Sequence, residues 1–497
     1  MKFVKNQFLI ALMFLIITGC AKREVLITVE VHEQSDVDML IYSVPISGTT
    51  YYGFTDTIKQ DETGKFELSL KITQPSFIII RDESFQNRVK LLVEPGKNYH
   101  ISMKPEKNVL ITGANEKGQM LYTTLPDPEF VELELRKIVN LRDDTISLIF
   151  VHQKINELKH SDMFKFQELL DSREISKSFF NLVQKDRDCY YALMEARFLL
   201  IRTYPSLRAE TKIEDELLEN LKKIYDQYPP NDERLIFSSF WSEYANLYIT
   251  EYKQFVQEGF DLQKSRELRD NGTFHTYIIN EAKTHLTGKA LEFFQARYIH
   301  FECFQGSYKG SFEKEFISLV EQFEEKHPKN DYSKFIKPYI DKIIGYHLII
   351  EQPFDPGMVF MDNYGTINTL KEAIKPLLGK KIYIDVWATW CGPCKVEFVH
   401  NEALKKMLAE NDIQMLYISI DRDDFDETWK NEIKYHHLIG THIHANAELV
   451  KDLRILYTNN PEGGIYIPWY ILVDEQGNIM EKHAKRPSQL VAGEKLW

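Results

Sequence analysis

Two cysteines, Cys391 and Cys394, lie where an apolar segment gives way to a helical pattern. The segment 381–387, KIYIDVW, is typical of a buried strand. A Cys-x-x-Cys pair in this position is specific, because the sulfurs can close a small ring and the first lies over the unpaired N–H groups of a helix N-terminus. The positive end of the helix favours thiolate, so we expect Cys391 to have a lowered pKa and to be the nucleophile. Cys394, one turn further in, is predicted to be shielded and to resolve the mixed disulfide.

The surrounding residues 387–395, WATWCGPCK, resemble the thioredoxin signature almost residue for residue. This resemblance implies a C-terminal α/β thioredoxin fold, and it assigns substrate contacts to Trp390, Gly392 and Pro393. The alternatives are a zinc site and a structural disulfide. Zinc normally needs four ligands, and the chain has no second Cys-x-x-Cys motif. We predict no metal here, and the nearby imidazoles are those of His436, His437, His442 and His444.

Asp385 is the one charged residue between Ile382 and Trp387 of the predicted strand. An isolated buried carboxylate is costly, and burial should raise its pKa toward the range of a proton carrier. By resemblance, Asp385 occupies the position of the buried thioredoxin aspartate that assists deprotonation of the second cysteine, here Cys394. A purely structural polar contact is the alternative.

Pro468 precedes the predicted strand 469–474. Proline at the head of a central strand is unusual, because it cannot donate a hydrogen bond to the ladder. The thioredoxin resemblance places the family's cis-proline here, facing the dithiol, where the backbone of Ile467 could pair with a substrate strand. A trans proline on an edge strand is the alternative.

The resemblance to thioredoxins covers residues 355–497. Within that superfamily, this segment is most similar to the membrane-tethered TlpA/ResA-like branch. Glu397, three residues beyond Cys394, is one pointer. Two departures are Val399, where the family often has a helix-kinking proline, and Trp469, where a threonine is usual. We expect the first to straighten the helix and the second to reshape the substrate groove.

The N-terminus reads as an export signal: Lys2 and Lys5 precede the apolar stretch 8–17, and small residues precede Cys20. The apolar run is shorter than the roughly 20 residues of a membrane-spanning helix. The segment resembles the lipobox of bacterial lipoproteins, in which the cysteine is acylated. Residues 1–19 are therefore predicted to be a lipoprotein signal peptide and Cys20 the lipidation site; an ordinary cleaved signal is the alternative.

Apolar residues alternate with polar ones from residue 24 to about 104, which predicts an antiparallel β-sandwich over residues 20–124. The region resembles the β domain that precedes thioredoxin modules in envelope proteins of Bacteroidetes-type bacteria. After a boundary at 125–128 the period becomes helical, so residues 125–350 are predicted to be all-α. Cys189 and Cys303 lie there, either paired with each other or as buried inert thiols. A third boundary at 353–357 precedes the thioredoxin-like domain, 355–497.

Composition limits the partners and cofactors. The chain has 497 residues, with 61 basic and 74 acidic side chains and a net charge of −13, so nucleic acid is not expected as a partner. No glycine-rich nucleotide fingerprint occurs, and we predict that the Cys391–Cys394 disulfide is the redox group without a further cofactor. The acidic residues Asp421, Asp423, Asp424 and Asp426 lack the spacing of a calcium loop and are expected to form a solvated loop and a helix cap.

These observations predict an extracytoplasmic thiol-disulfide oxidoreductase, lipid-anchored in the cell envelope, periplasmic or otherwise outside the cytoplasm. The Gly392-Pro393 pair and the family resemblance imply that it reduces protein disulfides through the Cys391–Cys394 dithiol. Its partners would be protein thiols and disulfides, such as apocytochrome cysteines by resemblance, and an upstream electron donor such as a membrane thiol reductase. Two alternatives stay open. The protein could be a disulfide isomerase, or a partner-binding envelope lipoprotein in which the dithiol is regulatory.

Overall fold

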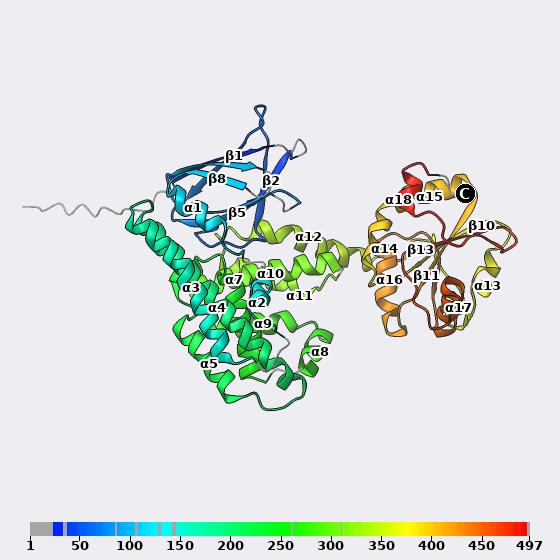
Figure 1. The fold of residues 1–497 in the computed structure, drawn as a ribbon. Helices are drawn as coiled ribbons and strands as arrows, with labels where there is room; N and C mark the ends of the chain where they lie inside the picture. Colours follow the sequence, from blue (N-terminus) through cyan, green and yellow to red (C-terminus); the bar gives the residue numbers. More distant parts are fainter. Residues whose placement is uncertain are drawn as a thin grey trace, which may run out of the picture. The chain divides into compact units, whose positions relative to one another are not determined.

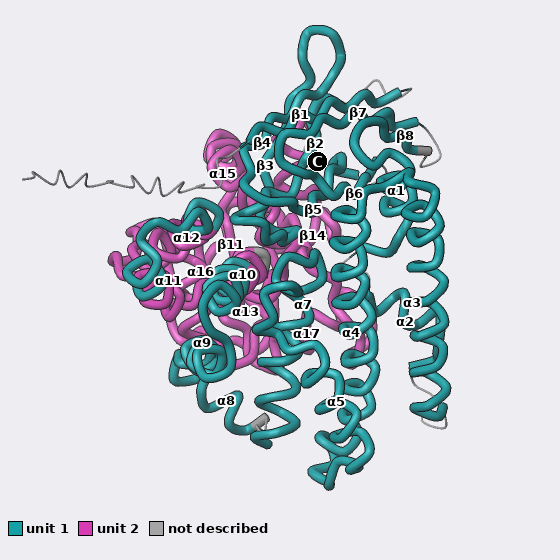
Figure 2. Tube along the Cα trace, turned by 90° about the vertical axis from the view of Figure 1, so that its left-hand side faces the viewer, with its two compact units in different colours: residues 1–300, 322–335 teal, residues 301–321, 336–497 magenta. Residues whose placement is uncertain are grey.

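The computed structural model describes residues 23–32, 37–84, 87–104, 108–127, 131–141, 146–259, 262–309 and 311–494. The chain divides into two compact units, residues 1–300 with 322–335 and residues 301–321 with 336–497 (Figure 2). The predicted signal peptide and Cys20 lie outside the described residues. The predicted boundaries at 125–128 and 353–357 remain predictions.

The N-terminal part contains the expected strands, drawn in blue in Figure 1, arranged as two four-stranded sheets of order β4-β1-β7-β8 and β3-β2-β5-β6. Alternate residues of both sheets enter one apolar cluster, as the period-two pattern requires. The expectation of purely antiparallel pairing was wrong at one place, because β1 and β7 run parallel. The strands are β1 Arg23–Val31, β2 Met39–Ser43, β3 Thr55–Lys59, β4 Phe66–Ile72, β5 Ser76–Arg81, β6 Arg88–Val93, β7 Asn98–Lys104 and β8 Asn108–Gly113.

The middle of the chain is helical, as its periodicity predicted. Leu217, Leu221 and Ile224 are buried on one face of α5, and Phe316 and Phe323 on one face of α11. The helices are α1 Glu116–Thr123, α2 Val131–Ile138, α3 Leu148–Asp171, α4 Lys177–Arg208, α5 Asp215–Gln227, α6 Glu233–Ile236, α7 Trp241–Asn246, the π-helix η2 Leu247–Gln257, α8 Leu262–Asp270, α9 Phe274–His285, α10 Gly288–Lys309, α11 Glu315–Lys326 and α12 Ser333–Ile350.

A buried carboxylate links three segments of the first unit that are far apart in the sequence. Asp186 of α4 accepts hydrogen bonds from the Tyr122 hydroxyl at 3.0 Å, the Ser238 hydroxyl at 2.7 Å and the Ser239 backbone N–H at 3.0 Å. Asp186 is fully buried, and these donors replace the water that the charge loses. The Tyr122 hydrogen bond therefore connects α1, which follows the strands, to α4.

Cys189 and Cys303 are both free and buried, so the possibility that they form a disulfide with each other was wrong. Burial raises the pKa of each thiol far above its ordinary value, which makes both thiols unreactive. Within the described residues, no helix combines the length and the apolar character needed to cross a membrane.

The C-terminal part contains a six-stranded sheet of order β14-β13-β10-β11-β12-β9. Strand β10 is central: it runs parallel to β11 and antiparallel to β13. Ile382, Ile384 and Val386 pack with α13 and α17 on one face, while Tyr383 and Trp387 face the other. The strands are β9 Met358–Phe360, β10 Lys381–Trp387, β11 Ile413–Ser419, β12 Gly440–His444, β13 Trp469–Val473 and β14 Ile479–Glu481.

The helix after the cysteine pair is interrupted. The helix α14 ends at Glu397, the 3₁₀ segment η5 spans Phe398–His400, and α15 begins at Asn401. The expectation that Val399 would straighten this helix was therefore wrong, since the interruption forms without a proline. The remaining helices are η3 Tyr364–Thr366, α13 Leu370–Ile374, η4 Lys375–Leu377, α14 Gly392–Glu397, α15 Asn401–Glu410, η6 Asp423–Phe425, α16 Asp426–Tyr435, α17 Ala447–Thr458 and α18 Pro487–Val491.

Candidate active site around the Cys391–Cys394 pair

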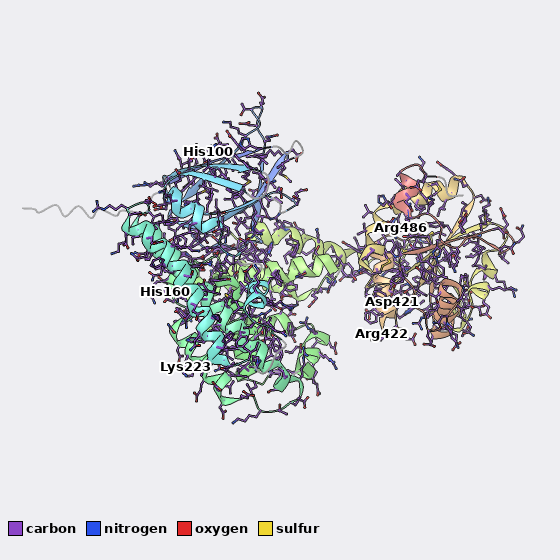
Figure 3. All side chains as sticks on the ribbon, viewed as in Figure 1. His100, His160, Lys223, Asp421, Arg422 and Arg486 are labelled. Atoms are coloured by element: carbon purple, nitrogen blue, oxygen red, sulfur yellow. A yellow bond between two sulfur atoms is a disulfide. The ribbon has the colours of Figure 1, made fainter. Side chains whose placement is uncertain are left out.

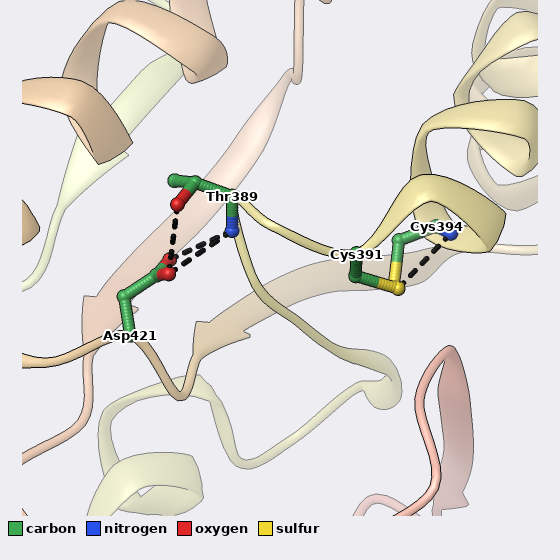
Figure 4. The surroundings of a disulfide bond; sticks show 4 residues. All are labelled: Thr389, Cys391, Cys394 and Asp421. Atoms are coloured by element: carbon green, nitrogen blue, oxygen red, sulfur yellow. Dashed lines mark hydrogen bonds between the residues drawn. A yellow bond between two sulfur atoms is a disulfide. The ribbon is translucent and has the colours of Figure 1, made fainter. Parts of the chain in front are cut away.

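The two cysteines form a disulfide at the N-terminus of α14 (Figure 4). Cys391 is the N-cap residue, and the Cys394 backbone N–H donates to its Sγ over 3.1 Å. Gly392 and Pro393 form the first turn, where proline is tolerated because its missing N–H has no helical partner. Cys391 is 3% exposed and Cys394 is completely buried. Cys394 is shielded, as expected, and Cys391 is itself almost buried in the disulfide form; the roles of the two sulfurs remain predictions.

The substrate-contact candidate beside this pair is open to solvent. Trp390 is 63% exposed, although it lies between the buried residues Thr389 and Cys391. A large exposed indole next to a reactive sulfur provides apolar surface for a partner chain.

Asp385 is buried in the middle of β10, as predicted, with 2% of its surface exposed. Its Oδ1 finds no hydrogen-bond partner among the described residues. Burial, together with the nearby Glu397 carboxylate, raises the pKa of Asp385 well above its ordinary value. A carboxyl group in this environment holds its proton more tightly than an exposed aspartate does.

The Ile467–Pro468 peptide bond is cis, as predicted. Ile467 packs against the cluster that contains both cysteines. The alternative of a trans proline on an edge strand was wrong, because β13 pairs with β10 on one side and β14 on the other. Trp469 is 2% exposed and packs in the core, where its indole N–H donates to the Lys482 carbonyl over 2.7 Å. This departure from the family pattern therefore fills the core beside the proline.

Asp421 is the site residue that the sequence interpretation missed. The expectation that it belongs to a solvated loop was wrong: it is 3% exposed, whereas Arg422, labelled beside it in Figure 3, is exposed. Its carboxylate accepts from the Thr389 backbone N–H at 2.9 Å and from the Thr389 hydroxyl at 2.8 Å. The Ser419 hydroxyl also donates to it over 2.6 Å. The available signal was its place at the end of β11, since neighbouring parallel strands end at the same sheet edge.

A buried ion pair holds α14 against α16. Lys395, which follows Cys394, lies 2.9 Å from the Glu432 carboxylate, and His436 lies 3.2 Å from the same group. Glu432 is 2% exposed, so the Lys395 ammonium group rather than water balances its charge.

Two of the histidines near the site, His437 and His442, contact protein side chains. His442 stacks on Tyr417, and burial lowers its pKa to about 4. His437 contacts Asp355 and Glu402. Within the described part of the chain, the group whose possible ligand atoms all lie within 4.8 Å is Glu258, Glu281 and His285 in the helical region, and it contains no cysteine. The absence of a metal and of a cofactor at the dithiol remains a prediction.

Comparison with known proteins found one family model and several curated relatives. The family model described as Redoxin matches residues 363–491. The thiol-disulfide oxidoreductase ResA of Bacillus thuringiensis subsp. konkukian (strain 97-27) is 27% identical over 128 residues, which is 26% of this chain and 65% of the relative. ResA of Bacillus anthracis is also 27% identical, over 127 residues with the same shares. The chain thus spans just under two thirds of the length of these curated relatives.

Solved structures align with only part of this chain, and their TM-scores are low. A thioredoxin family thiol:disulfide interchange protein from Chlorobium tepidum TLS is 21% identical, with 24% of this chain and 80% of that chain covered and a TM-score of 0.21. A thioredoxin-like protein from Bacteroides caccae ATCC 43185 is 10% identical, with 51% and 91% covered and a TM-score of 0.19.

The Redoxin match contains the helix that begins at the disulfide, the buried Asp385 and the cis-proline. The C-terminal part of the chain is a thioredoxin-superfamily domain of the TlpA/ResA-like kind.

Proposed function

We propose that this protein is an extracytoplasmic thiol-disulfide oxidoreductase that reduces disulfides of protein substrates through Cys391 and Cys394. The observation that carries the proposal is the position of Cys391 as the N-cap of α14, with the Cys394 N–H directed at its sulfur. In the reduced protein this N–H and the helix dipole stabilise a thiolate at Cys391.

The reaction proceeds by two exchanges. The Cys391 thiolate attacks one sulfur of the substrate disulfide, forms a mixed disulfide and releases the other substrate sulfur as a thiolate, which takes a proton from water. Cys394 then transfers its proton to the Asp385 carboxylate and attacks Cys391 Sγ. The mixed disulfide breaks, the second substrate sulfur leaves as a thiolate, and the Cys391–Cys394 bond forms. Two electrons pass from the dithiol to the substrate.

An upstream dithiol donor, such as a membrane thiol reductase, must restore the reduced pair, because each turnover consumes it. We assign substrate contacts to Trp390, Gly392, Pro393 and the backbone of Ile467, with Pro468 holding that backbone near the sulfurs. The exposed Trp390 and the packing of Ile467 against the cysteine cluster support this assignment. The substrate class is therefore an extended protein segment around a disulfide.

The cell envelope is the proposed location, with acylated Cys20 as the membrane anchor. We regard the two N-terminal sheets as a β-sandwich and, with the helical region, as the part that recognises partners. The similarity to ResA supports the redox assignment, while the lipobox-like segment before Cys20 supports the anchor.

The test is the reduction of insulin disulfides by dithiothreitol with catalytic amounts of the full chain. We expect clear acceleration by the wild-type protein and none by Cys391→Ser. Cys394→Ser should accumulate mixed disulfides through Cys391, and mass spectrometry of these adducts identifies the substrates. Failure of the wild-type chain to accelerate the reaction would refute the reductase assignment. If the reduced protein restored the activity of ribonuclease with scrambled disulfides but did not reduce insulin, the result would favour the isomerase alternative.

A further inference from the structure

The loop between β10 and α14 is hydrogen-bonded through Thr389 to Asp421, which lies two residues after the end of β11. The Thr389 backbone N–H lies within 3.1 Å of both Asp421 carboxylate oxygens, and the Thr389 hydroxyl donates to Oδ1 over 2.8 Å. Both residues are almost completely buried. Figure 4 shows these contacts immediately before the disulfide in the chain.

Ser419, the last residue of β11 and two residues before Asp421, holds the same carboxylate. The Ser419 hydroxyl donates to Asp421 Oδ2 over 2.6 Å, and the Asp421 backbone N–H donates to the Ser419 hydroxyl over 3.2 Å. Hydrogen bonds to an ionised acceptor are stronger than those between neutral groups, so Asp421 is a firm anchor at the end of β11.

The residues on either side of Thr389 show what the anchor controls. The β10 ladder ends at Trp387, whose carbonyl accepts from the Ile420 N–H, and Trp390 is 63% exposed. Between the end of the strand and Cys391, the Thr389–Asp421 contact therefore provides the buried polar attachment of this loop to β11.

We propose that Asp421 is a positioning residue of the dithiol, which through Thr389 holds Cys391 at the N-terminus of α14. This inference rests on the proposed redox function. Asp421 makes no contact with the reacting sulfurs in this role. It acts through Thr389, in the loop that leads to Cys391.

The redox state decides how much the anchor matters. In the oxidised protein the covalent bond to Cys394 holds Cys391 in place. In the reduced protein that bond is gone, and the Thr389–Asp421 hydrogen bonds keep the Cys391 sulfur over the Cys394 N–H. Weakening the anchor should therefore destabilise the reduced form more than the oxidised form, which makes the disulfide harder to reduce.

The test compares two single-hydroxyl deletions on the same carboxylate. Thr389→Val removes the hydroxyl donated from the dithiol loop, and Ser419→Ala removes the one donated from β11. Thr389→Ser keeps the loop hydroxyl and serves as the rescue variant. Thermal unfolding of each full-length variant checks that Thr389→Val and Ser419→Ala are folded and similarly destabilised.

Two measurements report on the reactivity and redox equilibrium of the Cys391 sulfur rather than on the stability of the fold. One is the rate of Cys391 alkylation by iodoacetamide at pH 7, followed by mass spectrometry of its peptide. The other is the dithiol–disulfide equilibrium constant against glutathione. For Thr389→Val we expect the alkylation rate and the equilibrium constant each to change by about fivefold to tenfold. A change of this size corresponds to the loss of one hydrogen bond to a charged group. Alkylation should slow, and the potential should become more negative, with tenfold in the equilibrium constant equal to about 30 mV.

Ser419→Ala and Thr389→Ser should stay within about twofold of the wild type. The inference is overturned if Thr389→Val is equally close to the wild type, or if Ser419→Ala changes both readouts as much as Thr389→Val does. Asp421→Ala gives a further check where it folds, because the effect of Thr389→Val should then disappear in that background; a persisting effect would also refute the role of Asp421.

These measurements do not depend on a protein substrate. If the wild-type protein fails to reduce insulin but Thr389→Val shifts the glutathione equilibrium as expected, the reductase assignment fails while the positioning role stands. If insulin is reduced and Thr389→Val matches Ser419→Ala, only the positioning role fails.

Discussion

The Glu397 carboxylate accepts two hydrogen bonds from Ser488, one from the backbone N–H at 2.9 Å and one from the hydroxyl at 3.0 Å. These bonds join α14, the helix of the dithiol, to α18 near the C-terminus. They also hold a negative charge close to Asp385, whose pKa rises partly because of it. The C-terminal helix thereby influences the proposed proton acceptor through one carboxylate.

Glu397→Gln should shift the pH dependence of the resolving step to lower pH. Removal of the like charge lowers the pKa of Asp385, although burial keeps it above the ordinary value. The step is measured as the rate at which Cys394 releases a preformed mixed disulfide, followed from pH 5 to 9. Ser488→Gly, which keeps the backbone donor, is the milder control; an unchanged profile in Glu397→Gln would contradict the coupling.

Asp385→Asn should stabilise the domain and slow the resolving step. At neutral pH an isolated buried carboxyl group is unfavourable, because its raised pKa means that the unfolded state loses its proton more readily. The stabilising contribution is present below the ordinary pKa and is lost as the pH rises toward the raised value.

We expect a gain of about 1–3 kcal/mol at pH 7 for this variant, measured by denaturant unfolding. The resolving rate should fall about a hundredfold, which is the lower end of general acid–base contributions. Iodoacetamide labelling of Cys391 provides the control, since the nucleophile should be much less affected than the resolving cysteine. Resolution at the wild-type rate would exclude Asp385 as the proton acceptor.

His442 should make the C-terminal domain sensitive to acid. Burial lowers its pKa to about 4, so the unfolded state binds a proton between about pH 6.5 and 4 while the folded state does not. Stability falls as the pH decreases through this window, by up to about 3 kcal/mol for the full difference. His442→Phe should keep the stacking on Tyr417 and flatten this part of the stability profile. Equal slopes for the two proteins would count against the assignment.

Glu432→Gln should destabilise the domain by about 3 kcal/mol, because it leaves the Lys395 ammonium group poorly paired at a mostly buried position. Lys395→Met in the same chain should recover much of this loss, since an apolar side chain of similar length replaces the charge. Urea unfolding of the two single variants and the double variant gives the coupling energy. Additive effects would show that the ion pair does not act as a unit.

The local sequence was sufficient to predict how the two cysteines are placed between a strand and a helix. The strand ending at Trp387, the helix starting at Gly392 and the cysteine at its N-cap are all encoded within residues 381–397, because strand and helix periods and capping are local properties. Asp385 could be predicted as buried for the same reason. Pro468 could be predicted as cis because its conflict with a central strand is visible in the sequence.

Contacts between distant segments were decided only by the tertiary structure. Asp421 meets Thr389 across 32 residues and Ser488 meets Glu397 across 91, and no local pattern distinguishes these side chains from solvated ones. The parallel pairing of β1 with β7 was likewise decided by the tertiary structure, and so was the burial of Cys189 and Cys303 as free thiols. The sequence by itself determined which atoms can react, because reactivity depends on residue type and local backbone. The folded chain decided which carboxylates are buried beside them, because burial depends on the packing of segments far apart in the chain.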